Sequence, residues 1–212
     1  MTKTTDQRFA RLVKIAKHVE PYAHALAVTL GNFRGTNDFA KTEPSLHNRF
    51  VLGEFHLDLI AIVVLRTSAL LSRGGGSTDA TLRSAAEFVG EPEVRARIAK
   101  QARAWVPGGD EHFAMTNERA AMRRVDRFLH VLADVDDDKL SKHRNWLLAH
   151  NTTKKPPGVL FIEVWEAAEA TLLAADDLVF FALGHDRDLV GVAVSRRQES
   201  SDFWRLLNEG SN

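Results

Sequence analysis

Apolar residues recur at the spacing of an α-helix along nearly the whole chain, and this period limits what the chain can fold into. The pattern is clear near the start, where Phe9, Leu12, Ala16 and Val19 fall on one helical face. Apolar residues make up 44% of the 212 residues, enough to bury a sizeable core. The sequence therefore predicts an all-α bundle of five to seven helices.

Turn signals place the boundaries of the first helices. Asp6 suits the N-cap of the first helix, and Pro21 either kinks that helix or starts a second one, which continues to Leu30. Gly31 to Pro44 is expected to be a polar loop, because glycine, asparagine and proline gather there. The following helices are expected at about Leu46–Leu71, Leu82–Val89, Pro92–Trp105, Met122–Leu132, in the motif after Asp138, and at Trp165–Val179.

The chain is expected to form a single domain over residues 1–212, because no Pro/Gly boundary separates two self-sufficient cores. The glycine-rich segment 72–80 is expected to be a flexible loop within it, since three consecutive glycines lose much entropy on ordering. A C-terminal extension follows from about residue 185. In it, Leu189 to Val194 could form a short strand or a helix, and Phe203, Trp204 and Leu207 indicate a short terminal helix.

Composition excludes several classes of protein. Cysteine is absent, so no disulfide or thiolate metal site is possible. The N-terminus lacks the apolar core of a signal peptide, and the apolar run Leu57–Leu71 is interrupted by Asp58 and Arg66, so it indicates a buried helix rather than a membrane span. We expect a cytoplasmic protein. The formal net charge is zero, so any nucleic acid must bind to a local patch.

The segment from Arg144 to His150 carries the most chemistry. Histidine transfers protons near neutral pH, and arginine stabilises the charge that develops on a phosphate, so the two together could cleave a phosphodiester. Other Arg–His pairs of similar spacing occur, for example Arg124 and His130, so spacing alone selects none. The context of the pair Arg144–His150 differs from that of the other pairs. Only in this pair does asparagine follow the arginine and alanine precede the histidine, and only here does a helix-breaking segment, residues 151–158, come directly after the histidine.

Helical geometry constrains how this pair could act. Six residues of helix separate Arg144 and His150 by a rise of about 9 Å and a rotation of about 120°. The two side chains therefore do not easily reach one small group from a single straight helix. A homodimer with the cleft at its two-fold axis would bring two copies of each side chain together, and we expect that arrangement.

The segment Lys142-His-Arg-Asn-Trp-Leu-Leu-Ala-His-Asn151 resembles the Arg-polar-x-x-x-Ala-His signature of the HEPN superfamily, in particular its branch related to abortive-infection protein type U. A softer similarity is Leu65–Arg73, where a long helix ends before a loop and a Ser/Thr-led short helix follows. The resemblance implies an α-helical homodimer, often a metal-independent endoribonuclease without a cofactor. The ribose 2′-hydroxyl would attack the adjacent phosphate. His150 would be the general base or acid, Arg144 would stabilise the phosphorane, and Asn145 would orient the cleft or the RNA.

The resemblance also implies a biological role, as a toxin or anti-phage effector that acts on RNA and could have an antitoxin partner. Trp146 departs from the family pattern, since a charged or small residue is expected there; it could stack on a base or simply pack. Many HEPN proteins have lost nuclease activity. A catalytically inactive helical module that binds protein, nucleotide or RNA is therefore the alternative function.

Several neighbouring residues are weaker candidates for RNA binding or for support of the site. His143 could face the same cleft, although it lies too far from His150 to share one zinc ion. Glu54 or Asp58, if buried, could pair with Arg144. Basic clusters could hold phosphates or simply be solvated helix faces. They are Lys154 with Lys155, the stripe Arg119, Arg123 and Arg127 with Arg124 beside it, and Arg95, Arg97, Lys100 and Arg103.

Interpretations of the motif that involve no catalysis are also open. A histidine at a helix C-terminus is favoured by the helix dipole without any catalysis, and a nearby arginine is usually solvated. In a third interpretation the protein is an oligomeric scaffold, with Arg144 and His150 buried against carboxylates such as Glu54 or Asp58. The nuclease instead requires both side chains to be accessible in one cleft.

Overall fold

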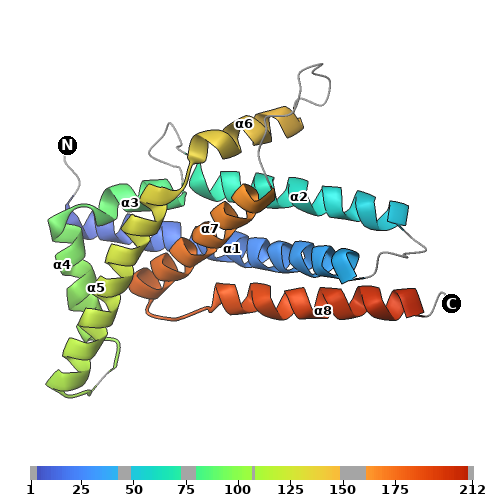
Figure 1. The fold of residues 1–212 in the computed structure, drawn as a ribbon. Helices are drawn as coiled ribbons and strands as arrows, with labels where there is room; N and C mark the ends of the chain where they lie inside the picture. Colours follow the sequence, from blue (N-terminus) through green and yellow to red (C-terminus); the bar gives the residue numbers. More distant parts are fainter. Residues whose placement is uncertain (1–3, 43–48, 73–79, 107, 149–160, 210–212) are drawn as a thin grey trace. The chain divides into compact units, whose positions relative to one another are not determined.

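In a computed structural model of the chain, the regular structure is entirely helical over the described residues, which are 4–42, 49–72, 80–106, 108–148 and 161–209 (Figure 1). The all-α class is confirmed. These ranges hold eight helices, more than the five to seven predicted. None of the helices described there is long and apolar enough to cross a membrane. They are α1 Thr5–Thr42, α2 Arg49–Leu71, α3 Leu82–Val89, α4 Pro92–Arg103, α5 Glu111–Asp134, α6 Asp137–Leu148, α7 Phe161–Leu183 and α8 Leu189–Glu209.

Backbone contacts divide the chain into two compact units. Unit 1 takes residues from Met1–Ala23, Ala69–Val135 and Ala170–Arg187. Unit 2 takes residues from His24–Ser68, Asp136–Glu169 and Asp188–Asn212. The bounds of α1, α2 and α7 each cross from one unit to the other, so each of these helices contributes to both.

In unit 1, α4 and α5 pack through residues at helical spacing. The buried positions of α4 are Val94, Ile98 and Ala102. On α5 the buried Phe128 meets Phe181 of α7 edge to face, with ring centroids 5.4 Å apart. The start of each helix follows ordinary rules, since α4 has proline in its first turn and the Asp110 carboxylate accepts a hydrogen bond from the Phe113 N–H, 3.0 Å away, at the start of α5.

A reciprocal cap begins α3 of unit 1. The Thr81 hydroxyl accepts from the Ser84 backbone N–H at 3.2 Å, and the Thr81 N–H donates to the Ser84 hydroxyl at 2.9 Å. We expect Thr81→Ala to lower the free energy of unfolding by about 1 kcal/mol, because the Ser84 backbone N–H loses its acceptor. Urea unfolding of this variant beside Thr81→Ser, which keeps the hydroxyl, measures the effect; equal losses in both variants would contradict it.

The prediction of a polar loop from Gly31 to Pro44 is wrong up to Thr42, because α1 runs without interruption to that residue and through Pro21. The glycines serve a packing role in unit 2. A Cβ atom on Gly31 would lie 2.5 Å from the Ala193 carbonyl oxygen of α8, and one on Gly35 would lie 2.7 Å from the Ser200 Cβ. Glycine is therefore required where the backbones of α1 and α8 approach closely, and no turn is involved.

Of the other predicted helices, some are confirmed and some have different bounds. The helix Leu82–Val89 is confirmed, whereas α4 ends at Arg103. Leu189 to Val194 is helical, and it continues without a break to Glu209, so the separate terminal helix does not exist. Most of the segment 72–80, namely 73–79, lies outside the described residues, and so does the segment 151–158 that was expected to end the motif.

Candidate functional site

Helix α6 carries the first part of the predicted motif, and local contacts in unit 2 hold it. The Asp136 carboxylate accepts from the Lys139 backbone N–H at 3.2 Å, as an N-terminal cap does. Leu140 is buried. The Lys139 ammonium lies 2.8 Å from the Glu163 carboxylate of α7, and this contact raises the pKa of Lys139. One apolar anchor and one exposed ion pair therefore fix the start of α6.

Arg144 and Asn145 form a joined pair on α6. The Arg144 guanidinium donates from Nε and Nη2 to the Asn145 Oδ1, at 3.2 and 3.0 Å. Arg144 is half-buried and Asn145 is exposed. Within the described residues no carboxylate pairs with Arg144. The partner of this guanidinium is thus a neutral amide, which leaves its positive charge uncompensated by the contacts that the structure describes.

His143 lies directly before this pair and is half-buried. Burial lowers the pKa of His143, since desolvation disfavours the charged imidazolium. The imidazole is therefore neutral near pH 7, the form that accepts a proton. This state fits a base or an RNA hydrogen-bonding group better than a phosphate-binding cation.

The rest of the predicted site is only partly placed. His150, Lys154 and Lys155 lie outside the described residues. Trp146 lies in α6, but its side chain is outside the described part. The structure therefore brings Arg144, Asn145 and His143 together on one helix and leaves the pairing of Arg144 with His150 a prediction.

The two carboxylates considered as partners of Arg144 are solvent-facing. Glu54 and Asp58 are both exposed on α2 of unit 2. In the part of the chain that the structure describes, neither forms an ion pair with Arg144. The scaffold interpretation requires Arg144 to be buried against a carboxylate, and no such contact is found among the described residues.

Most of the arginines in the predicted basic clusters pair with acids. Arg95, Arg97 and Arg103 pair with Asp126, Asp6 and Glu118 respectively, and Arg103 also pairs with Glu111. Arg119 and Arg123 are exposed on α5. The α4 cluster is therefore better described as an ion-paired helix surface than as a phosphate-binding face.

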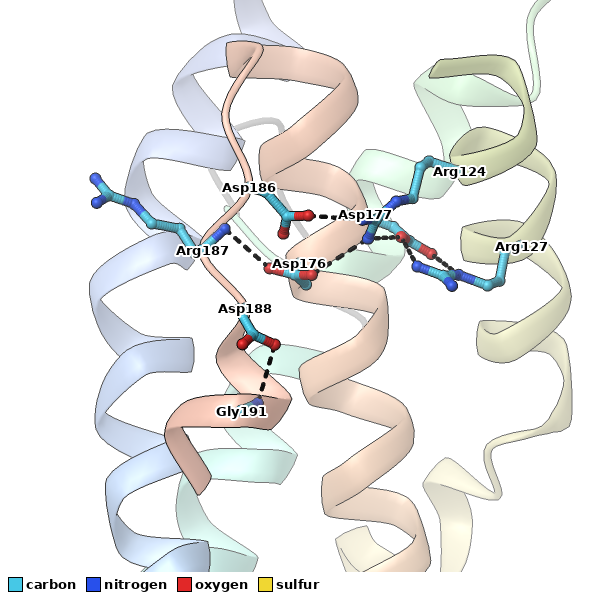
Figure 2. A network of polar contacts seen from close by, with 8 residues as sticks. All are labelled: Arg124, Arg127, Asp176, Asp177, Asp186, Arg187, Asp188 and Gly191. Carbon is cyan, nitrogen blue, oxygen red and sulfur yellow. Dashed lines mark hydrogen bonds and ion pairs between the residues drawn. The ribbon is translucent and has the colours of Figure 1, made fainter. Parts of the chain in front are cut away.

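Sequence reasoning missed a charge cluster in unit 1 that surrounds two buried aspartates, Asp176 and Asp177. Its other members are Arg124, Arg127 and Asp186 (Figure 2). Asp177 is fully buried on α7 and accepts from Arg124 Nη1 at 2.9 Å and from Arg127 Nε at 2.8 Å. These hydrogen bonds raise the pKa of Arg127, so its charge is fixed. Arg127 of the predicted basic stripe is thus paired with a buried carboxylate, although its own side chain is 43% exposed. The adjacent acids within an apolar helix, Asp176 and Asp177, were the signal that could have revealed the cluster.

Unit 2 contains a second missed charge, on α1. The Arg34 side chain is 9% exposed, and its Nη1 lies 2.6 Å from the Glu169 carboxylate of α7. Its guanidinium carbon also lies 3.8 Å from the ring centroid of Trp165. Pairing together with the cation–π contact offsets the desolvation of this guanidinium, so a structural role accounts for it.

Comparison of the chain with models of protein families, with curated proteins and with solved structures finds no match. Among the residues that the structure describes, no group of three or more His, Asp or Glu side chains could hold a metal ion. The candidate site therefore rests on α6 itself, with Arg144, Asn145 and His143 as its described residues.

Proposed function

We propose that the protein is a HEPN-type endoribonuclease that cleaves RNA without a metal ion, and that it acts as a toxin or anti-phage effector. Its catalytic residues are Arg144 and His150, with Asn145 as the residue that orients Arg144. The observation that carries the proposal is the Arg144 guanidinium, which is held by the amide oxygen of Asn145 and has no carboxylate partner among the described residues.

An arginine in that state suits a phosphate. A guanidinium already paired with a carboxylate would have to exchange one anion for another, whereas Arg144 can bind a phosphate oxygen while Asn145 keeps hold of Nε and Nη2. Several other described arginines, for example Arg103 and Arg124, are already occupied by carboxylates. This contrast favours Arg144 over those arginines as a ligand for phosphate.

In the proposed reaction, the imidazole of His150 takes the proton of the ribose 2′-hydroxyl as the oxygen attacks the adjacent phosphorus. The bond from phosphorus to the 5′-oxygen breaks, and that oxygen leaves with a proton as a 5′-hydroxyl. The other product ends in a 2′,3′-cyclic phosphate. Arg144 stabilises the negative charge on the non-bridging oxygens of the phosphorane. Two copies of the chain around a two-fold axis would supply the second acid–base group.

The test is RNA cleavage by the purified protein in the presence of a metal chelator, with the ends of the products mapped. We expect the wild-type protein to leave cyclic phosphate and 5′-hydroxyl ends. His150→Ala and Arg144→Ala are each expected to lose at least about 10²-fold in rate, because one removes the proton transfer and the other the charge stabilisation.

Arg205→Ala is the matched control, because it removes an equally positive side chain from an exposed position on α8 where Arg205 pairs with Asp202, and it is expected to cleave at the wild-type rate. Equal cleavage by wild type and His150→Ala would contradict the proposal. An absence of cleavage at high protein concentration, together with RNA binding that Arg144→Ala weakens, would favour the inactive binding module instead.

A further inference from the structure

One face of α1 within unit 1 is open to solvent and carries two lysines and two aromatic rings. The four residues, all exposed, are Lys14, Lys17, His18 and Tyr22. Their helical spacing places them on the same side of α1, while the residues between them, Ile15, Ala16 and Val19, are fully buried. Tyr22 is the single tyrosine of the chain and is 52% exposed. The outward face of this helix is therefore basic and aromatic at once.

The positive charges on this face have no acid beside them to neutralise them. Glu20 is the sole acidic residue between positions 7 and 24, and its carboxylate is engaged by Arg187, after the end of α7. In the part of the chain that the structure describes, neither Lys14 nor Lys17 forms an ion pair. This differs from α4, whose arginines pair with carboxylates. The face of α1 is thus complementary to an anionic ligand.

The two rings form an exposed surface on which a flat group can stack. The ring centroids of His18 and Tyr22 lie 4.9 Å apart, with their planes inclined by 40°. The side chains of a helix lean towards its N-terminus, so the His18 ring is directed towards the turn that carries Lys14. Aromatic side chains beside cations are what single-stranded nucleic acid binds, because every base has a face that stacks and every nucleotide has a phosphate.

We propose that this face, which we call the α1 platform and define as Lys14, Lys17, His18 and Tyr22, binds single-stranded RNA. Bases stack on the two rings, and the lysines contact the phosphates. The proposal rests on the proposed function in taking RNA as the ligand. A single strand fits better than a duplex, whose paired bases are stacked on one another and present no open face. An acidic peptide would satisfy the lysines and leave the rings unused.

Binding of a 2′-O-methyl oligoadenylate of about 12 nucleotides, a length within the range of single-strand binding sites, tests the lysines. This probe lacks the attacking 2′-hydroxyl, so binding is measured without cleavage, by fluorescence anisotropy at several salt concentrations. We expect Lys14→Gln combined with Lys17→Gln to flatten the slope of log K against log salt by about 1.4, because each phosphate contact with a single strand contributes about 0.7.

The matched control for the lysines is Arg196→Gln combined with Arg205→Gln. It removes the same charge from two exposed positions on α8, where Arg196 pairs with Glu199 and Arg205 pairs with Asp202. We expect this variant to keep the wild-type slope, because those arginines already have carboxylate partners.

The aromatic half of the platform is tested with the same probe. Tyr22→Leu is expected to weaken binding by about 5- to 150-fold, the range for the loss of one base–aromatic stack. Tyr22→Phe keeps the ring and is expected to bind as the wild type does. Tyr22 is exposed, so neither change removes a core side chain, and thermal unfolding of both variants checks that the fold is kept.

Equal binding by Tyr22→Leu and Tyr22→Phe, an unchanged salt slope in the lysine variant, or no binding by the wild type would each overturn the proposal. So would binding to vesicles of phosphatidylcholine and phosphatidylserine that needs the same residues when the RNA probe does not bind. The nuclease proposal is judged separately. RNA cleavage by a protein whose α1 variants bind normally would refute the platform alone, whereas binding through the platform without cleavage in chelator would refute the nuclease alone.

Discussion

Replacing Asp177 with alanine is expected to lower the free energy of unfolding by about 3–5 kcal/mol, the range for breaking a buried ion pair by removing one partner. Asp177 is fully buried and accepts from both Arg124 and Arg127. Without it, both guanidiniums keep their charge and lose their main acceptor. Thermal unfolding followed by far-UV circular dichroism is expected to show a midpoint lower by about 6–20 °C.

The neighbouring aspartates provide the controls. Asp186 has a half-exposed side chain, so Asp186→Ala is expected to cost less than about 1 kcal/mol. Asp176→Asn is expected to cost less than Asp177→Ala, because asparagine keeps the shape of the side chain and Asp177 still accepts from both arginines. If Asp177→Ala and Asp176→Asn destabilised the protein equally, Asp177 would not be the main acceptor of the two arginines.

The second large effect is expected at Gly35, where alanine is expected to lower the free energy of unfolding by about 3 kcal/mol. An added Cβ would lie 2.7 Å from the Ser200 Cβ and 2.9 Å from the Ser201 backbone nitrogen of α8. Backbone atoms cannot rotate away as a long side chain can, so α8 would have to move from α1 within unit 2. The loss exceeds the gain in helix propensity, which for this substitution is about 1 kcal/mol.

Gly53 of α2 offers a matched substitution, since it is exposed, also lies within a helix, and has no atom within 4 Å of an added Cβ. Gly53→Ala is expected to stabilise the protein by up to about 1 kcal/mol. Urea unfolding of both variants separates the steric effect from the propensity effect, because only the first differs between them. A stabilised Gly35→Ala protein would show that α1 and α8 tolerate a wider separation.

The sequence predicted a helix well where the signals for that helix lie within a few residues of one another. The short helix from Leu82 to Val89 was found because its apolar period and its threonine cap are both local. The segment after Gly31 was assigned to a loop because Gly31 and Gly35 look like turn residues until the partner helix is known. Ala193 and Ser200, which make glycine necessary there, lie more than 150 residues further along the chain.

The candidate site was predictable only in part for a related reason. The motif places Arg144 and Asn145 next to one another, and their hydrogen bond is a contact between neighbours in sequence. Whether an arginine meets a carboxylate depends on the fold. Arg127 and Arg123 fall in the same stripe of α5 and are both exposed, yet Arg127 donates to the buried Asp177, whereas no ion pair of Arg123 is found among the described residues. The pairing of Arg144 with His150 stays a prediction, because His150 lies outside the described residues.

The interleaving of the chain between the two units has a practical consequence for dissecting the protein. Each unit is assembled from three separate stretches, and the stretches of one alternate with those of the other. A truncation that keeps the whole of one unit must also keep most of the other, and any single cut divides at least one of them. Neither half can be produced alone as a conventional fragment. Single-tryptophan reporters at Trp105 in unit 1 and Trp204 in unit 2 of the intact chain are the better way to follow each half.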